Sequence, residues 1–116
     1  MKNIFVIVGP SASGKDTLFN KLLKNRDWDR LVLHSSRPIR KNEKNGVTYN
    51  FVDKSFFDNQ ENFIQILEFN EWKYGLHKSE LDKINQTGMV ILSIKATKQL
   101  IEYVSTLEEE YNIYPI

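Results

Sequence analysis

Runs of apolar residues alternate along this chain with segments in which apolar residues recur at helical spacing. Residues 3–8 (N-I-F-V-I-V) and 89–94 (M-V-I-L-S-I) are apolar on both faces, which is typical of strands buried in a parallel sheet. Residues 15–25 and 97–110 carry apolar stripes that predict helices. A further strand is expected from residue 113. This alternation predicts an α/β fold in which helices flank a parallel sheet.

The middle of the chain has shorter apolar runs and predicts a small mixed or antiparallel insertion. The following short strands are expected: 31–33, 47–52, 63–69 and 72–74. Helices are predicted at two places: 54–62 and 77–86, the second ended by Thr87-Gly88. Asn45-Gly46 predicts a turn. We therefore divide the chain into a core, residues 1–34 and 88–116, and an insertion with its return helix, residues 35–87.

The sequence G-P-S-A-S-G-K at residues 9–15 follows the first strand and has the spacing of a phosphate-binding P-loop. Gly9 and Gly14 allow the backbone to approach a ligand closely, so that its N–H groups converge on phosphate oxygens. Lys15 can reach the outer phosphates as a mobile charge. We predict a site for a nucleotide or polyphosphate made by these residues: Gly9, Ser11, Ala12, Ser13, Gly14, Lys15, Asp16 and Thr17. A glycine-containing turn without a ligand is the alternative.

The residues that follow the lysine depart from the P-loop pattern. The motif has Ser or Thr there, whose hydroxyl ligates Mg²⁺. Here Asp16 comes first and Thr17 second. Carboxylate oxygen is a hard ligand, so we expect both residues to lie near Mg²⁺ that is bound with ATP.

Residues 35–52 contain a second group of side chains that can bind phosphate. Arg37 and Arg40 are three residues apart in a polar loop and can converge on one phosphate, each with a planar fork of donors. Tyr49 adds a hydroxyl from the strand that follows. A second anion site suggests a second phosphorylated substrate. The residues alone leave open a basic loop that only faces water.

The order and spacing of these motifs resemble the guanylate kinase family. The P-loop is followed by S-S-R-P-I-R-x-x-E-x-x-G-x-x-Y-x-F-V from residue 35, by I-L-E at 66–68 and by K-Y-G at 73–75. The resemblance runs along nearly the whole chain. It implies a P-loop NTPase-type core with an inserted domain that holds GMP, and transfer of the ATP γ-phosphoryl group to GMP or dGMP.

The resemblance also implies roles for individual residues. Lys15 would hold ATP, and the implied catalytic residues are Lys15, Arg37 and Arg40. The implied GMP site consists of seven residues: Ser35, Arg37, Arg40, Tyr49, Glu68, Tyr74 and Gly75. Glu68 would accept hydrogen bonds from the N1–H and amino group of guanine, a donor pair that adenine lacks.

Some positions depart from the family pattern. Leu33 and Leu76 stand where the family often has small hydroxyl residues, and Ser93 and Lys95 stand where it usually has acidic ones. The family also continues beyond the strand at 113 into an arginine-bearing lid and an adenine-clasping segment. We therefore expect a C-terminally truncated kinase whose phosphoryl transfer is weak or absent in this chain alone. The alternatives are a catalytically inactive nucleotide- or protein-binding module and a kinase for another (deoxy)nucleoside monophosphate.

Composition narrows these possibilities. The 116 residues suit one modest domain, and 41% hydrophobic with 27% charged residues is an ordinary globular balance. The net charge of +1 gives no electrostatic argument for nucleic acid or an anionic membrane as a partner. The absence of cysteine excludes disulfides and thiolate chemistry and fits a cytoplasmic protein. No apolar run approaches the ~18 residues of a membrane span. The oligomeric state is left open.

Overall fold

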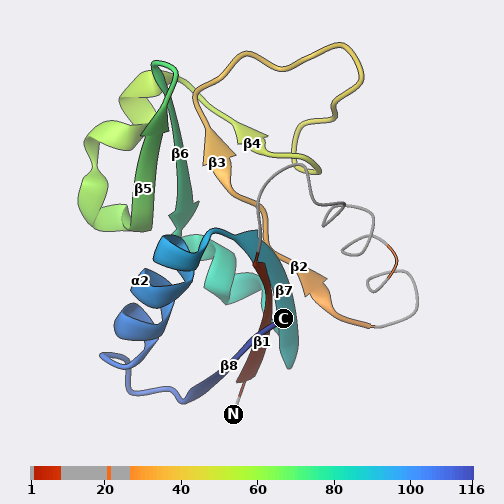
Figure 1. Cartoon of the computed structure of the whole chain (residues 1–116), viewed down its shortest axis with the longest axis vertical. Helices are drawn as coiled ribbons and strands as arrows, with labels where there is room; N and C mark the ends of the chain where they lie inside the picture. Colours follow the sequence, from red (N-terminus) through yellow and green to blue (C-terminus); the bar gives the residue numbers. More distant parts are fainter. Residues whose placement is uncertain (1, 9–20, 22–26) are drawn as a thin grey trace. The chain divides into compact units, whose positions relative to one another are not determined.

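Two compact units make up the chain (Figure 1). Unit 1 consists of residues 1–31 and 81–116, and unit 2 of residues 32–80. The computed structural model describes the following residues: 2–8, 21 and 27–116. The helix predicted at 15–25 lies outside them, apart from Lys21. Each unit has its own four-stranded sheet and is described by itself.

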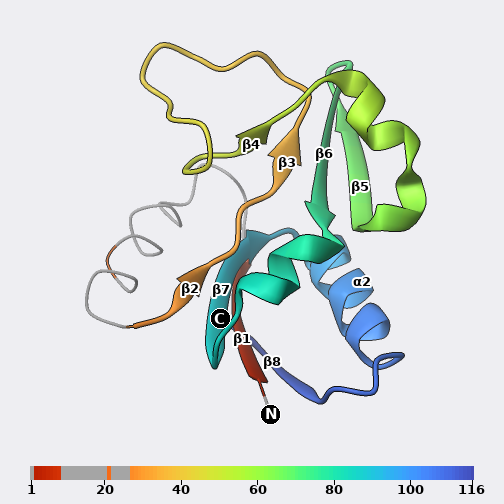
Figure 2. The ribbon, with the colours of Figure 1, turned by 180° about the vertical axis from the view of Figure 1, so that it is seen from behind.

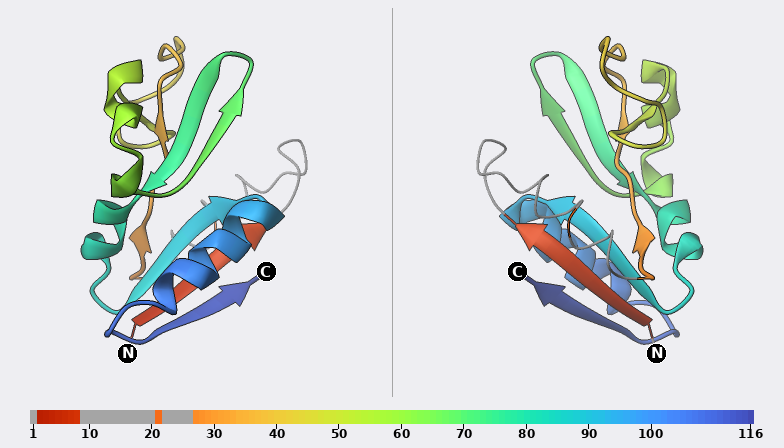
Figure 3. Two further views of the ribbon diagram at one scale, coloured as in Figure 1. Left: turned by 90° about the vertical axis from the view of Figure 1, so that its left-hand side faces the viewer. Right: turned by 90° about the vertical axis from the view of Figure 1, so that its right-hand side faces the viewer.

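Unit 1 is built on a parallel sheet with strand order β2-β7-β1-β8 (Figure 3). Its strands are β1 (Lys2–Val8), β2 (Asp29–Arg30), β7 (Thr87–Leu92) and β8 (Tyr111–Pro115). The central pair is the most apolar, and Ile4, Val6 and Met89 are wholly buried. A strand that is covered on both faces has apolar residues on both, whereas a surface strand alternates apolar and polar residues. The sequences of β1 and β7 are for this reason continuous apolar runs. The predicted parallel core sheet is confirmed.

Aromatic rings cover one face of this sheet. Phe5 of β1 stacks on Trp28 with ring centroids 4.5 Å apart and on Tyr114 of β8 at 4.9 Å. Ile7 and Met89 are buried beside this stack. The stacked rings therefore add buried apolar area to a sheet whose outer strand β2 is only two residues long.

Helix α2 (Ile94–Val104) begins directly after β7. The Ser93 hydroxyl accepts a hydrogen bond from the Ala96 N–H at 3.1 Å and caps the helix. Ala96, Leu100 and Val104 form its buried stripe. The predicted helix at 97–110 is therefore correct in type and wrong in bounds, because a capping serine starts the helix three residues earlier.

The end of α2 is also earlier than predicted. The hydroxyls of Ser105 and Thr106 donate to the carbonyls of Glu102 and Tyr103, at 2.6 and 2.7 Å. Such bonds give the backbone an alternative to continued helix. The chain then turns and enters β8 at Tyr111. Among the described residues, no helix is long and apolar enough to cross a membrane.

Unit 2 contains a mixed sheet with strand order β4-β3-β6-β5 (Figure 2). Its strands are β3 (His34–Ser35), β4 (Asn50–Phe51), β5 (Phe63–Phe69) and β6 (Trp72–His77). β3 pairs with β4 in parallel, and the other two pairs are antiparallel. Three short 3₁₀ helices are associated with this part of the chain: Lys54–Asp58, Gln60–Asn62 and Lys78–Lys83. The prediction that this part of the chain forms a small mixed sheet is confirmed.

The two faces of this mixed sheet differ in chemistry. Residues paired directly across strands point to the same face. His34 pairs with Gly75, and we call their face the packing face. His34 stacks on Phe56 at 5.2 Å, and Phe63 lies edge-on to both rings. Gly75 has no room for a side chain, because an added Cβ would lie 2.9 Å from the Phe63 ring. We call the opposite face the arginine face.

Several predicted elements of unit 2 are wrong in detail. Residues 31–33 are no strand, because Leu31 donates to Met89 of β7 while the Leu33 carbonyl already accepts from Asn50. The segment passes from one sheet to the other. The strand predicted at 47–52 is reduced to β4, because Gly46 adopts a φ of +84° and the turn occupies the residues before it. The predicted helices at 54–62 and 77–86 are short 3₁₀ helices, and Thr87-Gly88 begins β7.

A buried carboxylate joins the first and last residues of unit 2. The Val32 N–H donates to Oε1 of Glu80 at 2.8 Å, and the two residues are 4% and 2% exposed. A buried N–H without a partner is costly, so this bond fixes the point at which the chain enters and leaves the unit.

Replacing Glu80 by alanine should lower the free energy of unfolding by about 2 kcal/mol, because the buried Val32 N–H loses its acceptor. Urea unfolding of the full chain measures this loss. Glu61→Ala is the matched control, because Glu61 is an exposed carboxylate of the same unit. Equal stability of the two variants would contradict the role given to Glu80.

Candidate functional site

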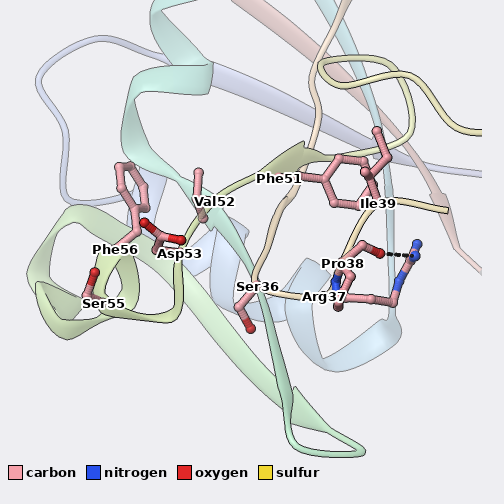
Figure 4. Close-up of a pocket in the computed structure, with 9 residues that line it drawn as sticks. All are labelled: Ser36, Arg37, Pro38, Ile39, Phe51, Val52, Asp53, Ser55 and Phe56. Carbon is pink, nitrogen blue, oxygen red and sulfur yellow. Dashed lines mark hydrogen bonds between the residues drawn. The ribbon is translucent and has the colours of Figure 1, made fainter.

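A hydrogen-bonded polar group of unit 2 centres on Arg37, which is only 8% exposed. Its guanidinium binds both oxygens of Glu43, with Nη1–Oε1 at 2.9 Å and Nη2–Oε2 at 2.8 Å. Nη1 also donates to the Pro38 carbonyl at 3.1 Å (Figure 4). The Arg37 N–H donates to Oγ of Ser35, at the end of β3. The backbone and the side chain of Arg37 are therefore both fixed.

Aromatic rings surround this guanidinium on the arginine face. Its Cζ lies 5.3 Å from the ring centroid of Tyr49 and 5.5 Å from that of Phe51, within the range of cation–π attraction. The rings of Tyr49 and Tyr74 are 5.5 Å apart. Tyr74 pairs with Ser35 across β6 and β3. The structure thus brings together four of the predicted site residues: Ser35, Arg37, Tyr49 and Tyr74.

The ion pair shifts the pKa values of both partners. Hydrogen bonds from Arg37 lower the pKa of Glu43 from about 4.5 to about 2, helped by the Arg40 N–H. The hydrogen bonds to Glu43 raise the pKa of Arg37, and the Tyr74 hydroxyl adds to this. Both groups are therefore charged throughout the neutral range, as an anion site requires of its arginine.

Arg40 enters this group through its backbone. Its N–H donates to Oε1 of Glu43 at 2.8 Å, and the Glu43 N–H donates back to the Arg40 carbonyl at 3.0 Å. The residue itself is exposed. A reciprocal pair of this kind closes a tight turn between the two residues. The loop therefore presents the second arginine at its surface.

Glu68 is placed apart from this group. Leu67 pairs with Tyr74 in the β5–β6 hairpin, so Glu68, the next residue, points to the packing face, where it pairs with Lys73. Glu68 is exposed near the end of the hairpin. Gly75 also lies on the packing face, beneath the Phe63 ring. The register therefore separates these two predicted residues from Tyr49 and Tyr74.

The role of Glu43 could not be assigned from the sequence. It is one acidic residue in a basic loop, six positions after Arg37. No periodic pattern connects the two, because the contact depends on the path of the loop. Two indications were available: Glu43 is the E of the motif S-S-R-P-I-R-x-x-E quoted above, and it is an acidic residue within a short basic segment, where a buried arginine needs a counter-charge.

An open pocket of about 710 Å³ lies beside Arg37. Figure 4 shows Arg37, Pro38, Ile39 and Phe51 on one side of it, with Val52, Asp53, Ser55 and Phe56 on the other. Of the predicted site residues that the structure describes, Arg37 lines this pocket and the others do not. The Ser36 hydroxyl, between the two sides, accepts from the Lys73 N–H at 2.9 Å.

The predicted P-loop falls on residues whose structure is not described. These are Gly9, Ser11, Ala12, Ser13, Gly14, Lys15, Asp16 and Thr17. What is described is the strand before them. β1 ends at Val8, which pairs with Leu92 of β7, and Ser93 follows as the cap of α2. Within residues 2–8, 21 and 27–116, no group of three or more His, Asp or Glu side chains could hold a metal ion.

Comparison with known proteins decides the family. The family model described as guanylate kinase matches residues 1–110. This chain belongs to the guanylate kinase family. The predicted resemblance is therefore confirmed, and the α/β fold with it.

Individual guanylate kinases match over a large part of this chain. A guanylate kinase of Neisseria gonorrhoeae is 38% identical over 97 residues, covering 79% of this chain and 47% of that protein. One of Schizosaccharomyces pombe is 33% identical over 104 residues, covering 82% and 51%. The chain thus spans about half the length of the curated relatives that it matches.

A solved structure supports the fold. The crystal structure of guanylate kinase from Anaplasma phagocytophilum matches with a TM-score of 0.71 over 98% of this chain and 57% of that one. Their sequence identity is 22%, so this likeness concerns the fold alone.

Acid should weaken unit 2 through Glu43. Because the folded-state pKa of about 2 lies below the ordinary 4.5, its contribution is present above about pH 5 and is lost as the pH falls towards 2. We expect the stability difference between wild type and Glu43→Gln to be largest near neutrality and to shrink over this range. Urea unfolding at a series of pH values measures it. A difference that does not vary with pH would contradict the ion pair.

Proposed function

We propose that this chain carries the nucleotide sites of a guanylate kinase. It would take part in transferring the γ-phosphoryl group of ATP to GMP or dGMP, giving ADP and GDP or dGDP. Besides membership of the family, one structural observation supports this proposal. Arg37 is held on the arginine face by Glu43, beside the rings of Tyr49 and Tyr74. A fixed guanidinium beside two hydroxyl groups is suited to a phosphate monoester.

The acceptor phosphate would be bound by four side chains. Arg37 would supply a fork of donors, and Tyr49 and Tyr74 would supply hydroxyls. Arg40 is exposed on the same loop and would close on the phosphate from the solvent side. Ser35 would act indirectly, because its hydroxyl accepts from the Arg37 N–H at 3.1 Å. The two arginines would neutralise charge on the phosphate that accepts the transferred group.

ATP would bind at residues 9–17, with Lys15 on its outer phosphates. The parallel sheet of unit 1 supports this proposal, because ligands of such sheets bind beyond the carboxyl ends of the strands. Val8 ends the central strand at that edge, directly before the predicted loop. Asp16 and Thr17 are the residues proposed to lie near Mg²⁺, which would neutralise charge on the phosphates of ATP.

A second proposal concerns the acceptor base. Guanine recognition by Glu68 rests on the family resemblance, whereas the register places Glu68 on the packing face. Leu76 is fully buried at a position where the family often has a hydroxyl residue. These observations favour, as the second candidate, a kinase that accepts another nucleoside monophosphate.

Arg37→Ala should weaken GMP binding by at least about tenfold, because a charge-assisted bidentate contact with phosphate is lost. Calorimetric titration of the full chain with GMP measures this. Arg37→Lys keeps the charge and loses the planar fork, so it should also bind more weakly than wild type.

Lys73→Ala is the matched control for Arg37, because Lys73 is a cation of the neighbouring strand on the packing face. Its GMP affinity should equal that of the wild type. Unfolding midpoints show whether Arg37→Ala still folds. GMP binding that is unaffected by either Arg37 variant, or absent from the wild type, would refute the proposed acceptor site.

Glu68→Gln tests how the base is read. If Glu68 binds the N1–H and amino group of guanine, the ratio of GMP to AMP affinity should fall by about tenfold or more. Titrations with GMP and AMP measure the ratio, and Glu71→Gln in the adjacent turn is the control. An unchanged ratio would place base selection elsewhere, in agreement with the register of the hairpin.

A further inference from the structure

One carboxylate is shared by both arginines of the proposed acceptor site. Oε1 of Glu43 accepts from Nη1 of Arg37 at 2.9 Å and from the Arg40 N–H at 2.8 Å. Oε2 accepts from Nη2 of Arg37 at 2.8 Å. The Glu43 side chain is itself 15% exposed, and that of Arg37 is 8% exposed. The pair is therefore largely enclosed and removed from the screening that weakens surface ion pairs.

The geometry of these bonds determines which part of Arg37 faces a ligand. A guanidinium has five N–H donors in one plane. Three are used by Oε1, Oε2 and the Pro38 carbonyl, all on Nη1 and Nη2. The other two, on Nε and Nη2, lie along a single edge of the plane, and the Tyr74 side chain also hydrogen-bonds the guanidinium. That edge is a second fork with the spacing of two phosphate oxygens.

We infer that Glu43 is a positioning residue of the acceptor site, which holds the Arg37 guanidinium in one orientation beside the rings of Tyr49 and Tyr74 and fixes the backbone of Arg40 beside it. This inference rests on the proposed function. In this arrangement the Glu43 side chain does not contact the phosphate that Arg37 binds. Its effect is to remove, before binding, the rotamer freedom that a long arginine side chain would otherwise lose on binding.

The sign of the effect separates positioning from simple electrostatics. A carboxylate beside an anion site repels the anion, so neutralising Glu43 should by charge alone strengthen phosphate binding. If Glu43 competed with the phosphate for Arg37, neutralising Glu43 would also strengthen phosphate binding. Loss of positioning gives the opposite sign, because a guanidinium without its anchor no longer presents a fixed fork.

The test compares Glu43→Gln with Glu61→Gln, which removes one exposed carboxylate from the same unit. Calorimetric titration of the full chain with GMP should give a dissociation constant raised about tenfold by Glu43→Gln and unchanged by Glu61→Gln. Glu43→Asp keeps the charge but is one methylene shorter, so it should lie between wild type and Glu43→Gln. Tighter or unchanged GMP binding in Glu43→Gln would overturn the inference.

A second measurement does not depend on the ligand. The ¹⁵Nε–¹H signal of Arg37, assigned by its loss in Arg37→Lys, should show an ordered group in the wild type. In Glu43→Gln it should become mobile on the picosecond–nanosecond timescale, while unfolding midpoints confirm a folded chain. An equally ordered Nε in Glu43→Gln overturns the inference whatever the binding result. Failure of the wild type to bind GMP, with Arg37 still ordered by Glu43, refutes the proposed function instead.

Discussion

The parallel pairing of β1 with β7 on one side and β8 on the other is the constraint on which unit 1 depends. The register aligns Val8 with Leu92, so the segment after β1 and the cap of α2 leave the sheet at the same edge. Ile4 and Val6 lie on one face of the sheet and Met89, which pairs with Phe5, lies on the other, and all three are wholly buried. A shift by one residue would therefore exchange two faces that are each filled by packed side chains. Burial therefore fixes the place from which the predicted phosphate loop departs.

In unit 2 the residues of the candidate site around Arg37 also stabilise the fold of the unit. A buried arginine is tolerated only when it is paired and hydrogen-bonded, and Glu43 supplies that pairing from the same loop. The rings of Tyr49 and Phe51 lie over the guanidinium, with centroids 5.3 and 5.5 Å from its Cζ. Arg37 thus organises the loop and, in the proposed function, binds the ligand. Stability and binding are for this reason hard to separate by mutation of Arg37 alone.

The sequence predicted what depends on local patterns and missed what depends on register and loop path. The strands at β1, β5 and β7 were predictable from continuous or alternating apolar runs. Leu31 and Val32 are buried, as residues of a strand would be, and their apolar character therefore predicted a strand. Apolar character alone does not indicate that the chain passes from one sheet to the other at these residues. The face of Glu68 is set by the two-residue turn Asn70–Glu71, whose φ values are +51° and +71°. Neither residue is glycine, so the sequence gives little indication of that turn.

The bond between Val32 and Glu80 has a consequence for the tolerance of unit 2 to change. Because the first and last residues of unit 2 lie within hydrogen-bond distance, the unit is equivalent to a long insertion with closed ends. The entropy of closing such a loop grows only slowly with its length, so residues between the two points can be added or removed at small cost to the parallel sheet. In the proposed function, changes of acceptor selection within unit 2 would leave the register of the unit 1 strands unaffected.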